Sequence, residues 1–211
     1  MKKLSTLGFS IVALVLFLFP FSVSAKTEMT NLKEAVDEEI EIFGQAQGYE
    51  NAVEELKSYD LSNYKDDKNK VNVYMFRGAS CGHCFEAIVH FASIYAEEGK
   101  YFNVKTYEVW NNEDNKKLMD SVAEKLGEEA GGVPFIVIGD KSWGGYSASM
   151  DDEMMKEIKS QYNKKASARH DIIKNTNVKE ENHDILYVII IVVVAVGITC
   201  GIVFTRNNAT K

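Results

Sequence analysis

Cys81 and Cys84 enclose Gly82 and His83, and this short Cys-Gly-His-Cys segment carries the strongest chemical signal in the chain. It lies where a β-prone run gives way to a helical stripe of apolar residues. Two cysteines three residues apart at a helix start can approach closely enough to form a disulfide. The free N–H groups and the positive dipole end at that position favour the thiolate form of Cys81. We therefore expect Cys81 to be the attacking sulfur and Cys84 to resolve the mixed disulfide.

His83 is expected to tune this pair. A positive imidazole between the cysteines would stabilise the thiolate, and therefore the reduced form. A pair whose reduced form is stabilised is the stronger oxidant. The segment thus predicts donation or rearrangement of disulfides rather than strong reduction.

Zinc binding and a purely structural disulfide are the alternative uses of these cysteines. A structural zinc site needs four ligands. The candidate ligands near the motif are Cys81, Cys84 and His83 or His90, because Cys200 falls in an apolar C-terminal run. A structural bridge would close a very small loop and add little stability. We expect no metal site and no cofactor.

A second segment, Gly131-Gly132-Val133-Pro134, precedes another β-prone run. Pro134 is the one proline outside the N-terminal apolar stretch, and an X-Pro bond in such a position is a candidate for the cis isomer. Taken alone, the segment favours an ordinary turn before a strand.

The elements needed to position both segments follow from periodicity. Strands are expected at 71–76, 102–110, 135–138 and 142–145, and helices from Phe85, from Leu118 and over 150–162. This alternation predicts a mixed α/β domain with a central sheet. Residues 26–70 are expected to form two short acidic helices broken between Gly44 and Gly48, with the charge run 37–39 on a solvated face. This segment would either complete the fold or contact a partner.

The two ends of the chain indicate export and anchoring. Lys2 and Lys3 precede an apolar run that closes on Val23-Ser24-Ala25, the pattern of a secretory signal. Residues 185–204 contain no charge and are long enough to cross a bilayer. An exported chain would leave its folded domain outside the cytosol and its short tail inside. Gly197 and Gly201 make a weak Gly-x-x-x-Gly signal for a homodimer.

These observations divide the chain into expected parts. They are a signal peptide (1–25), an acidic helical extension (26–70), an α/β domain (71–165), a polar linker (166–184), a transmembrane helix (185–204) and a cytoplasmic tail (205–211). The net charge of -7 argues against a nucleic-acid partner. With three cysteines, the chain is not a disulfide-rich scaffold.

Together the motifs resemble the thioredoxin superfamily over about residues 71–162, and Gly82-His83 is similar to the dipeptide of protein disulfide isomerases. The resemblance implies a thioredoxin-like fold with a cis-proline loop facing the dithiol. Val133 and Pro134 would then bind the substrate backbone. The chain departs from the family pattern at two positions. Ser80 replaces the common tryptophan before the first cysteine, and Met75 stands where a buried acid is common.

The leading functional hypothesis is a membrane-anchored, extracytoplasmic thiol–disulfide oxidoreductase. It would act on thiols and disulfides of exported proteins and be recycled by a membrane redox partner. A non-catalytic thioredoxin-like accessory protein for export of a secreted peptide is the alternative. Metal delivery through Cys81, His83 and Cys84 is a third hypothesis.

Overall fold

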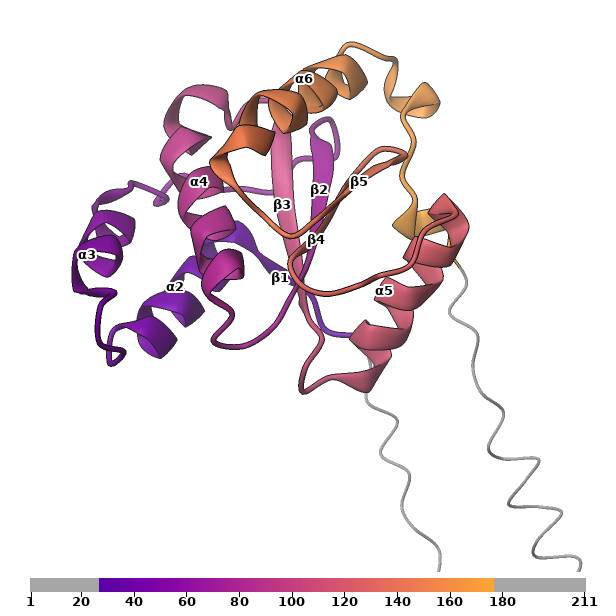
Figure 1. Cartoon of the computed structure of the whole chain (residues 1–211). Helices are drawn as coiled ribbons and strands as arrows, with labels where there is room; N and C mark the ends of the chain where they lie inside the picture. The colour runs from indigo at the N-terminus through magenta and orange to yellow at the C-terminus, as the bar shows by residue number, and fades with distance from the viewer. Residues whose placement is uncertain (1–26, 177–211) are drawn as a thin grey trace, which may run out of the picture. The chain divides into compact units, whose positions relative to one another are not determined.

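The computed structural model describes residues 27–176, which form a five-stranded mixed sheet flanked by helices (Figure 1). The strands are β1 (Thr30–Asn31), β2 (Val71–Arg77), β3 (Phe102–Glu108), β4 (Phe135–Ile138) and β5 (Lys141–Gly144). They lie in the order β1-β3-β2-β4-β5, and β2 and β3 are parallel while the other pairs are antiparallel. The expected α/β class and the four expected strands are confirmed.

The helices cover both faces of this sheet. They are α2 (Leu32–Phe43), α3 (Glu50–Ser58), α4 (Gly82–Glu98), α5 (Glu113–Leu126) and α6 (Asp151–Tyr162). Residues of α2, α3, α4 and α6 share one core with Val73 and Met75 of β2, and α5 lies across the strands from α4 (Figure 1). Tyr74 and Phe76 alternate with Val73 and Met75, as the two-residue period of a strand requires, and are buried on the other face.

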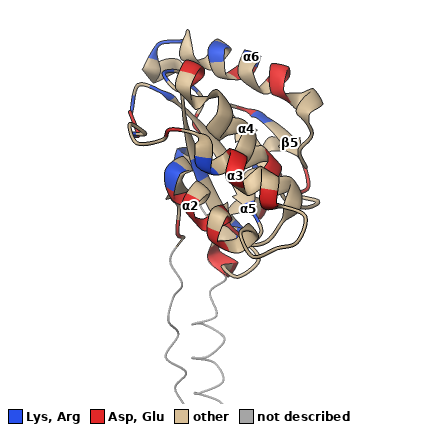
Figure 2. Cartoon of the chain, turned by 90° about the vertical axis from the view of Figure 1, so that its left-hand side faces the viewer, with Lys and Arg blue, Asp and Glu red and all other residues tan. Residues whose placement is uncertain are grey.

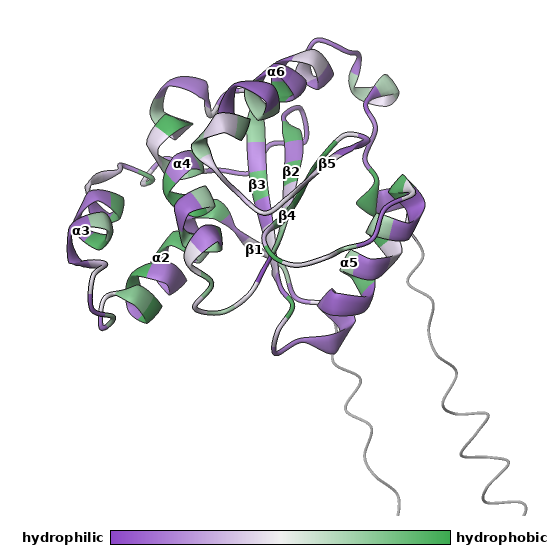
Figure 3. Ribbon diagram, in the orientation of Figure 1, coloured by the Kyte–Doolittle hydropathy of each residue, from purple (hydrophilic) through white to green (hydrophobic). Residues whose placement is uncertain are grey.

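Apolar residues concentrate on the strands and on the helix sides that face them (Figure 3). Acidic residues are distributed over α2, α3, α5 and α6, and each of these helices also carries lysine (Figure 2). The acidic excess of the chain is therefore spread over several helices rather than gathered in one.

The segment before residue 71 packs into the same core as the strands. The short strand β1 pairs with β3, and Leu32, Phe43 and Val53 lie in the common core. The reason is that an amphipathic helix must bury its apolar stripe, and the sheet face beside α4 offers the surface to do so. The break between the two helices at residues 44–49 is confirmed.

The segment after residue 165 also packs on the domain, although it was expected to begin a tether. Two short 3-10 turns occupy Ala166–Ala168 and Ile173–Asn175. Between them Ile172 is buried, and Asp171 accepts a hydrogen bond of 2.7 Å from the Tyr74 hydroxyl. Ile172 and Asp171, together with Arg169, which donates to the carbonyl oxygens of Asn69 and Tyr162, therefore anchor this stretch to the domain.

Several expectations concern residues outside the described range. They are the signal at 1–25, the rest of the linker, the span at 185–204 with Gly197, Cys200 and Gly201, and the tail at 205–211. Within residues 27–176, no helix is both long enough and apolar enough to cross a membrane.

Candidate functional site

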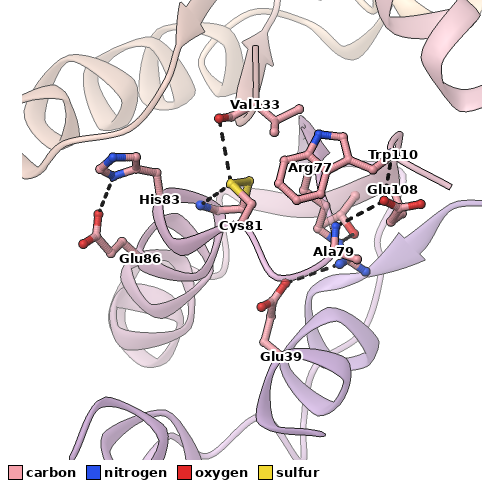
Figure 4. Close-up of a disulfide and its surroundings, with 11 residues drawn as sticks. Glu39, Arg77, Ala79, Cys81, His83, Glu86, Glu108, Trp110 and Val133 are labelled. Carbon is pink, nitrogen blue, oxygen red and sulfur yellow. Dashed lines mark hydrogen bonds and ion pairs between the residues drawn. A yellow bond between two sulfur atoms is a disulfide. The ribbon is translucent and has the colours of Figure 1, made fainter. Parts of the chain in front are cut away.

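Cys81 and Cys84 form a disulfide at the start of α4, directly after the turn that follows β2 (Figure 4). Their Cα atoms are 5.2 Å apart. Cys81 is the N-cap residue, and its sulfur accepts the backbone N–H of Cys84 at 3.2 Å. Cys81 is 8% exposed whereas Cys84 is 0% exposed, so Cys81 is the more accessible residue of the pair. The helix N–H groups aimed at this sulfur would stabilise a thiolate there.

The Val133–Pro134 loop lies against this sulfur. The peptide bond between the two residues is cis, and the Val133 carbonyl oxygen is 3.8 Å from the Cys81 sulfur (Figure 4). The N–H of Gly145 donates to the Pro134 carbonyl at 2.7 Å and so fixes the loop to the residue after β5. The structure thus brings together the two segments that the sequence singled out, 52 residues apart at Cys81 and Val133.

His83 does not contact the Cys81 sulfur. Its side chain points away from the disulfide and places Nδ1 3.0 Å from a carboxylate oxygen of Glu86, one turn along α4 (Figure 4). Both side chains are largely exposed. Any effect of His83 on the cysteine pair must therefore act through space and in the presence of the negative charge of Glu86.

Gly82 has a packing role beside its place between the cysteines. A Cβ atom added at this position would lie 2.8 Å from the hydroxyl oxygen of Tyr49. Tyr49 belongs to the connection between α2 and α3 and packs its ring against Phe43 and Phe85. The absence of a side chain at residue 82 lets this aromatic cluster reach the start of α4.

A buried charged cluster lies below the loop that leads to Cys81, and sequence reasoning missed it. Arg77, the last residue of β2, places Nη1 3.3 Å from Glu39, also pairs with Glu38, and donates from Nε to Thr106 at 3.1 Å. Glu39 is 0% exposed, and one of its carboxylate oxygens has no hydrogen-bond partner. Burial raises the pKa of Glu39 to about 7 and lowers that of Arg77, which the nearby Glu108 partly opposes.

The position of Glu39 could have been found from spacing alone. We expected residues 37–39 to lie on a solvated face, and this is wrong for Glu39. Glu39 follows Leu32 by seven residues and Val36 by three, so it lies on the buried side of α2.

Glu108 joins the loop before Cys81 to the loop after β3. One carboxylate oxygen accepts the N–H groups of Ala79 at 3.2 Å and Trp110 at 2.8 Å, and the other accepts that of Asn111 at 2.9 Å. Trp110 is 56% exposed, and its indole ring covers Gly78 so closely that a Cβ there would lie 2.2 Å from the ring. No sequence pattern that we used indicated either residue.

Within residues 27–176, no group of three or more histidine, cysteine, aspartate or glutamate side chains is arranged to hold a metal ion. Comparison of the chain with protein-family models, with curated proteins and with solved structures found no match. The functional argument therefore depends on the geometry of this site.

Proposed function

We propose that this chain is a thiol–disulfide oxidoreductase of the thioredoxin superfamily that forms or rearranges disulfides in exported proteins. The observation that carries the proposal is the Cys81–Cys84 pair at the N-terminus of α4, in which Cys81 is the more exposed residue and Cys84 is completely buried. A reachable sulfur that caps a helix is the arrangement expected of an attacking thiolate.

The order of elements supports a thioredoxin-like fold. The parallel strands β2 and β3 are joined through α4, and the antiparallel pair of β4 and β5 is followed by α6. Cys81 lies between β2 and α4, Cys84 lies in the first turn of α4, and the cis Val133–Pro134 bond lies just before β4, as the resemblance implies.

In the oxidising direction, a substrate thiolate attacks the Cys81 sulfur. The Cys81–Cys84 bond breaks, and Cys84 leaves as a thiolate that takes up a proton. A second substrate thiolate then attacks the substrate sulfur of the mixed disulfide, forms the substrate disulfide and releases the Cys81 thiolate. The substrate loses the electrons that the cysteine pair gains. A disulfide supplied by a membrane redox partner then reoxidises the pair.

Rearrangement uses the reduced form of the same site. The Cys81 thiolate attacks a substrate disulfide, and a different substrate thiolate later displaces it, so no net electron transfer occurs. When no such thiolate arrives, Cys84 attacks Cys81 in the mixed disulfide and releases the substrate. In both directions Val133 and Pro134 would hold the backbone of the substrate beside the reacting sulfur.

The proposed setting is the outer side of a membrane. The signal at 1–25 would export the chain, and the span at 185–204 would retain it with the redox domain outside the cytosol. Disulfide formation in exported proteins takes place in such oxidising compartments.

Cysteine substitutions in the full chain test the proposal. Cys84→Ser should accumulate mixed disulfides between Cys81 and substrate, because no resolving thiol is present, and Cys81→Ser should form none. Cys200→Ser is the matched control and should behave as the wild type. Full turnover of a disulfide substrate by Cys81→Ser would refute the proposal. Undiminished function in cells of the Cys81→Ser/Cys84→Ser double variant would instead support the accessory role in export.

A further inference from the structure

A hollow of about 200 Å³ opens beside the cysteine pair. Its apolar lining comes from three segments: the loop after β3, α5, and the loop before β4. The residues that line it include Trp110, Met119, Gly131, Gly132 and Val133. Because Val133 also contacts the Cys81 sulfur, the hollow and the redox site share one wall.

Trp110 is fixed in a solvent-facing position. Among residues 27–176, only Met29 and Trp110 are large apolar side chains classed as exposed. The Trp110 ring lies on Gly78, and its backbone N–H is bound by Glu108, which also binds Ala79 in the loop before Cys81. Trp110 is exposed, is held in place by these contacts and lies beside the cysteine pair. These features favour a binding role for its ring.

The charges at the rim do not select a charged ligand. Lys116 and Asp120 lie at the edge of the hollow and pair with each other at 2.9 Å. The two charges compensate each other. An uncharged apolar group that enters the hollow would therefore not leave either charge buried without its partner. Gly131 and Gly132 are exposed and face open space, which leaves room for a chain to run along the loop.

We propose that the hollow is a side-chain subsite for an extended polypeptide, and that it accepts a large apolar residue within two positions of the substrate cysteine. This inference rests on the proposed function, since it places the substrate cysteine at Cys81. An extended chain advances about 3.3 Å per residue, so a cysteine at Cys81 leaves its near neighbours beside Val133 and Trp110. The exposed ring of Trp110 thus supplies an aromatic surface next to the dithiol. Ser80, which stands in place of the common tryptophan, offers no such surface.

Peptide binding tests the inference without requiring redox chemistry. The probes are two labelled peptides with serine in place of cysteine, one with leucine and one with glycine at the adjacent positions. They are titrated into the oxidised full chain in lipid nanodiscs. We expect the leucine peptide to bind about tenfold more tightly, as burial of a large apolar side chain implies. Equal binding of the two peptides by the wild type would overturn the inference.

Three variants locate the preference. Trp110→Ala should remove it. Gly132→Leu adds a side chain in open space at the wall and should also reduce it, without deleting any packed group. Met29→Ala removes the other exposed apolar side chain and should retain the full preference. A tenfold preference that survives in both Trp110→Ala and Gly132→Leu would refute the subsite.

The failure of the proposed function would look different. If the wild type prefers the leucine peptide and Trp110→Ala does not, the subsite is supported even when disulfide exchange is absent. If exchange occurs and the peptides bind equally, the redox function stands and the subsite is refuted.

Discussion

The Arg77 guanidinium lies 3.3 Å from the Glu39 carboxylate, inside the domain and below the loop that carries Cys81 (Figure 4). Glu38 also pairs with Arg77, so two carboxylates share one guanidinium. Glu39 is the more buried of the two and retains an oxygen without a hydrogen-bond partner. The cluster therefore contains a surplus negative charge that burial disfavours.

The pH dependence of stability should reveal that surplus charge. Burial raises the pKa of Glu39 from 4.5 to about 7. Between these values the folded state binds more protons than the unfolded state, so stability from this group falls as pH rises and the loss is complete above about pH 7. The loss is roughly 3 kcal/mol at most. Urea unfolding of wild type and Glu39→Gln at pH 4.5 and pH 8 measures it.

Glu39→Gln should gain stability relative to the wild type as pH rises, because glutamine carries no charge to bury. Exposed Glu41→Gln on the same helix is the matched control and should follow the wild-type profile. Parallel profiles for wild type and Glu39→Gln would show that Arg77 compensates Glu39 fully.

Gly78→Ala tests how much the contact between the Trp110 ring and Gly78 contributes to stability. The added methyl group would lie 2.2 Å from the indole ring, so the ring must move. We expect a loss of about 1 to 3 kcal/mol in stability and a change in tryptophan emission. Gly131→Ala adds the same group in open space and should leave both quantities unchanged. If Trp110→Ala did not relieve the cost of Gly78→Ala in the double variant, the contact would not be its cause.

The segment after residue 165 should contribute to stability. A chain ending at residue 165 loses the buried Ile172 and the carboxylate of Asp171 that binds Tyr74, whereas a chain ending at 176 keeps both. The shorter chain should be less stable by roughly 2 to 4 kcal/mol. Ile172→Ala in the full chain should reproduce much of this loss, and exposed Ser167→Ala should not. Equal unfolding midpoints of the two truncated chains would contradict the prediction.

The elements and the cysteine pair could be predicted because their signals are local. Period-two and helical spacing predicted the strands and helices. The cysteine pair lies where the first of these strands gives way to a helix, so its place at a helix start could be predicted too. Glu108 and Trp110 could not be found in this way, because their roles depend on contacts with Ala79 and Gly78, about thirty residues away in the sequence. The burial of Val53 and Ile172 could not be predicted for a similar reason, since it depends on surfaces made by distant segments.

Glu86 is expected to set the redox balance of the pair through His83. The carboxylate lies 3.0 Å from the imidazole and places a negative charge near the start of α4. Glu86→Gln should therefore stabilise the Cys81 thiolate and make the pair more oxidising, and His83→Ala should make it less so. Both groups are exposed, so each shift should be small, roughly 10 to 20 mV.

Equilibration of the full chain with glutathione buffers, followed by alkylation and mass measurement, gives these potentials. Glu97→Gln is the charge-matched control, because residue 97 lies eleven positions further along α4 and about 16 Å away, beyond the screening length. Shifts of opposite sign in Glu86→Gln and His83→Ala, with none in Glu97→Gln, would assign the tuning to this pair. A shift of the same size in Glu97→Gln would mean that the net charge of the domain, rather than the His83–Glu86 pair, sets the potential.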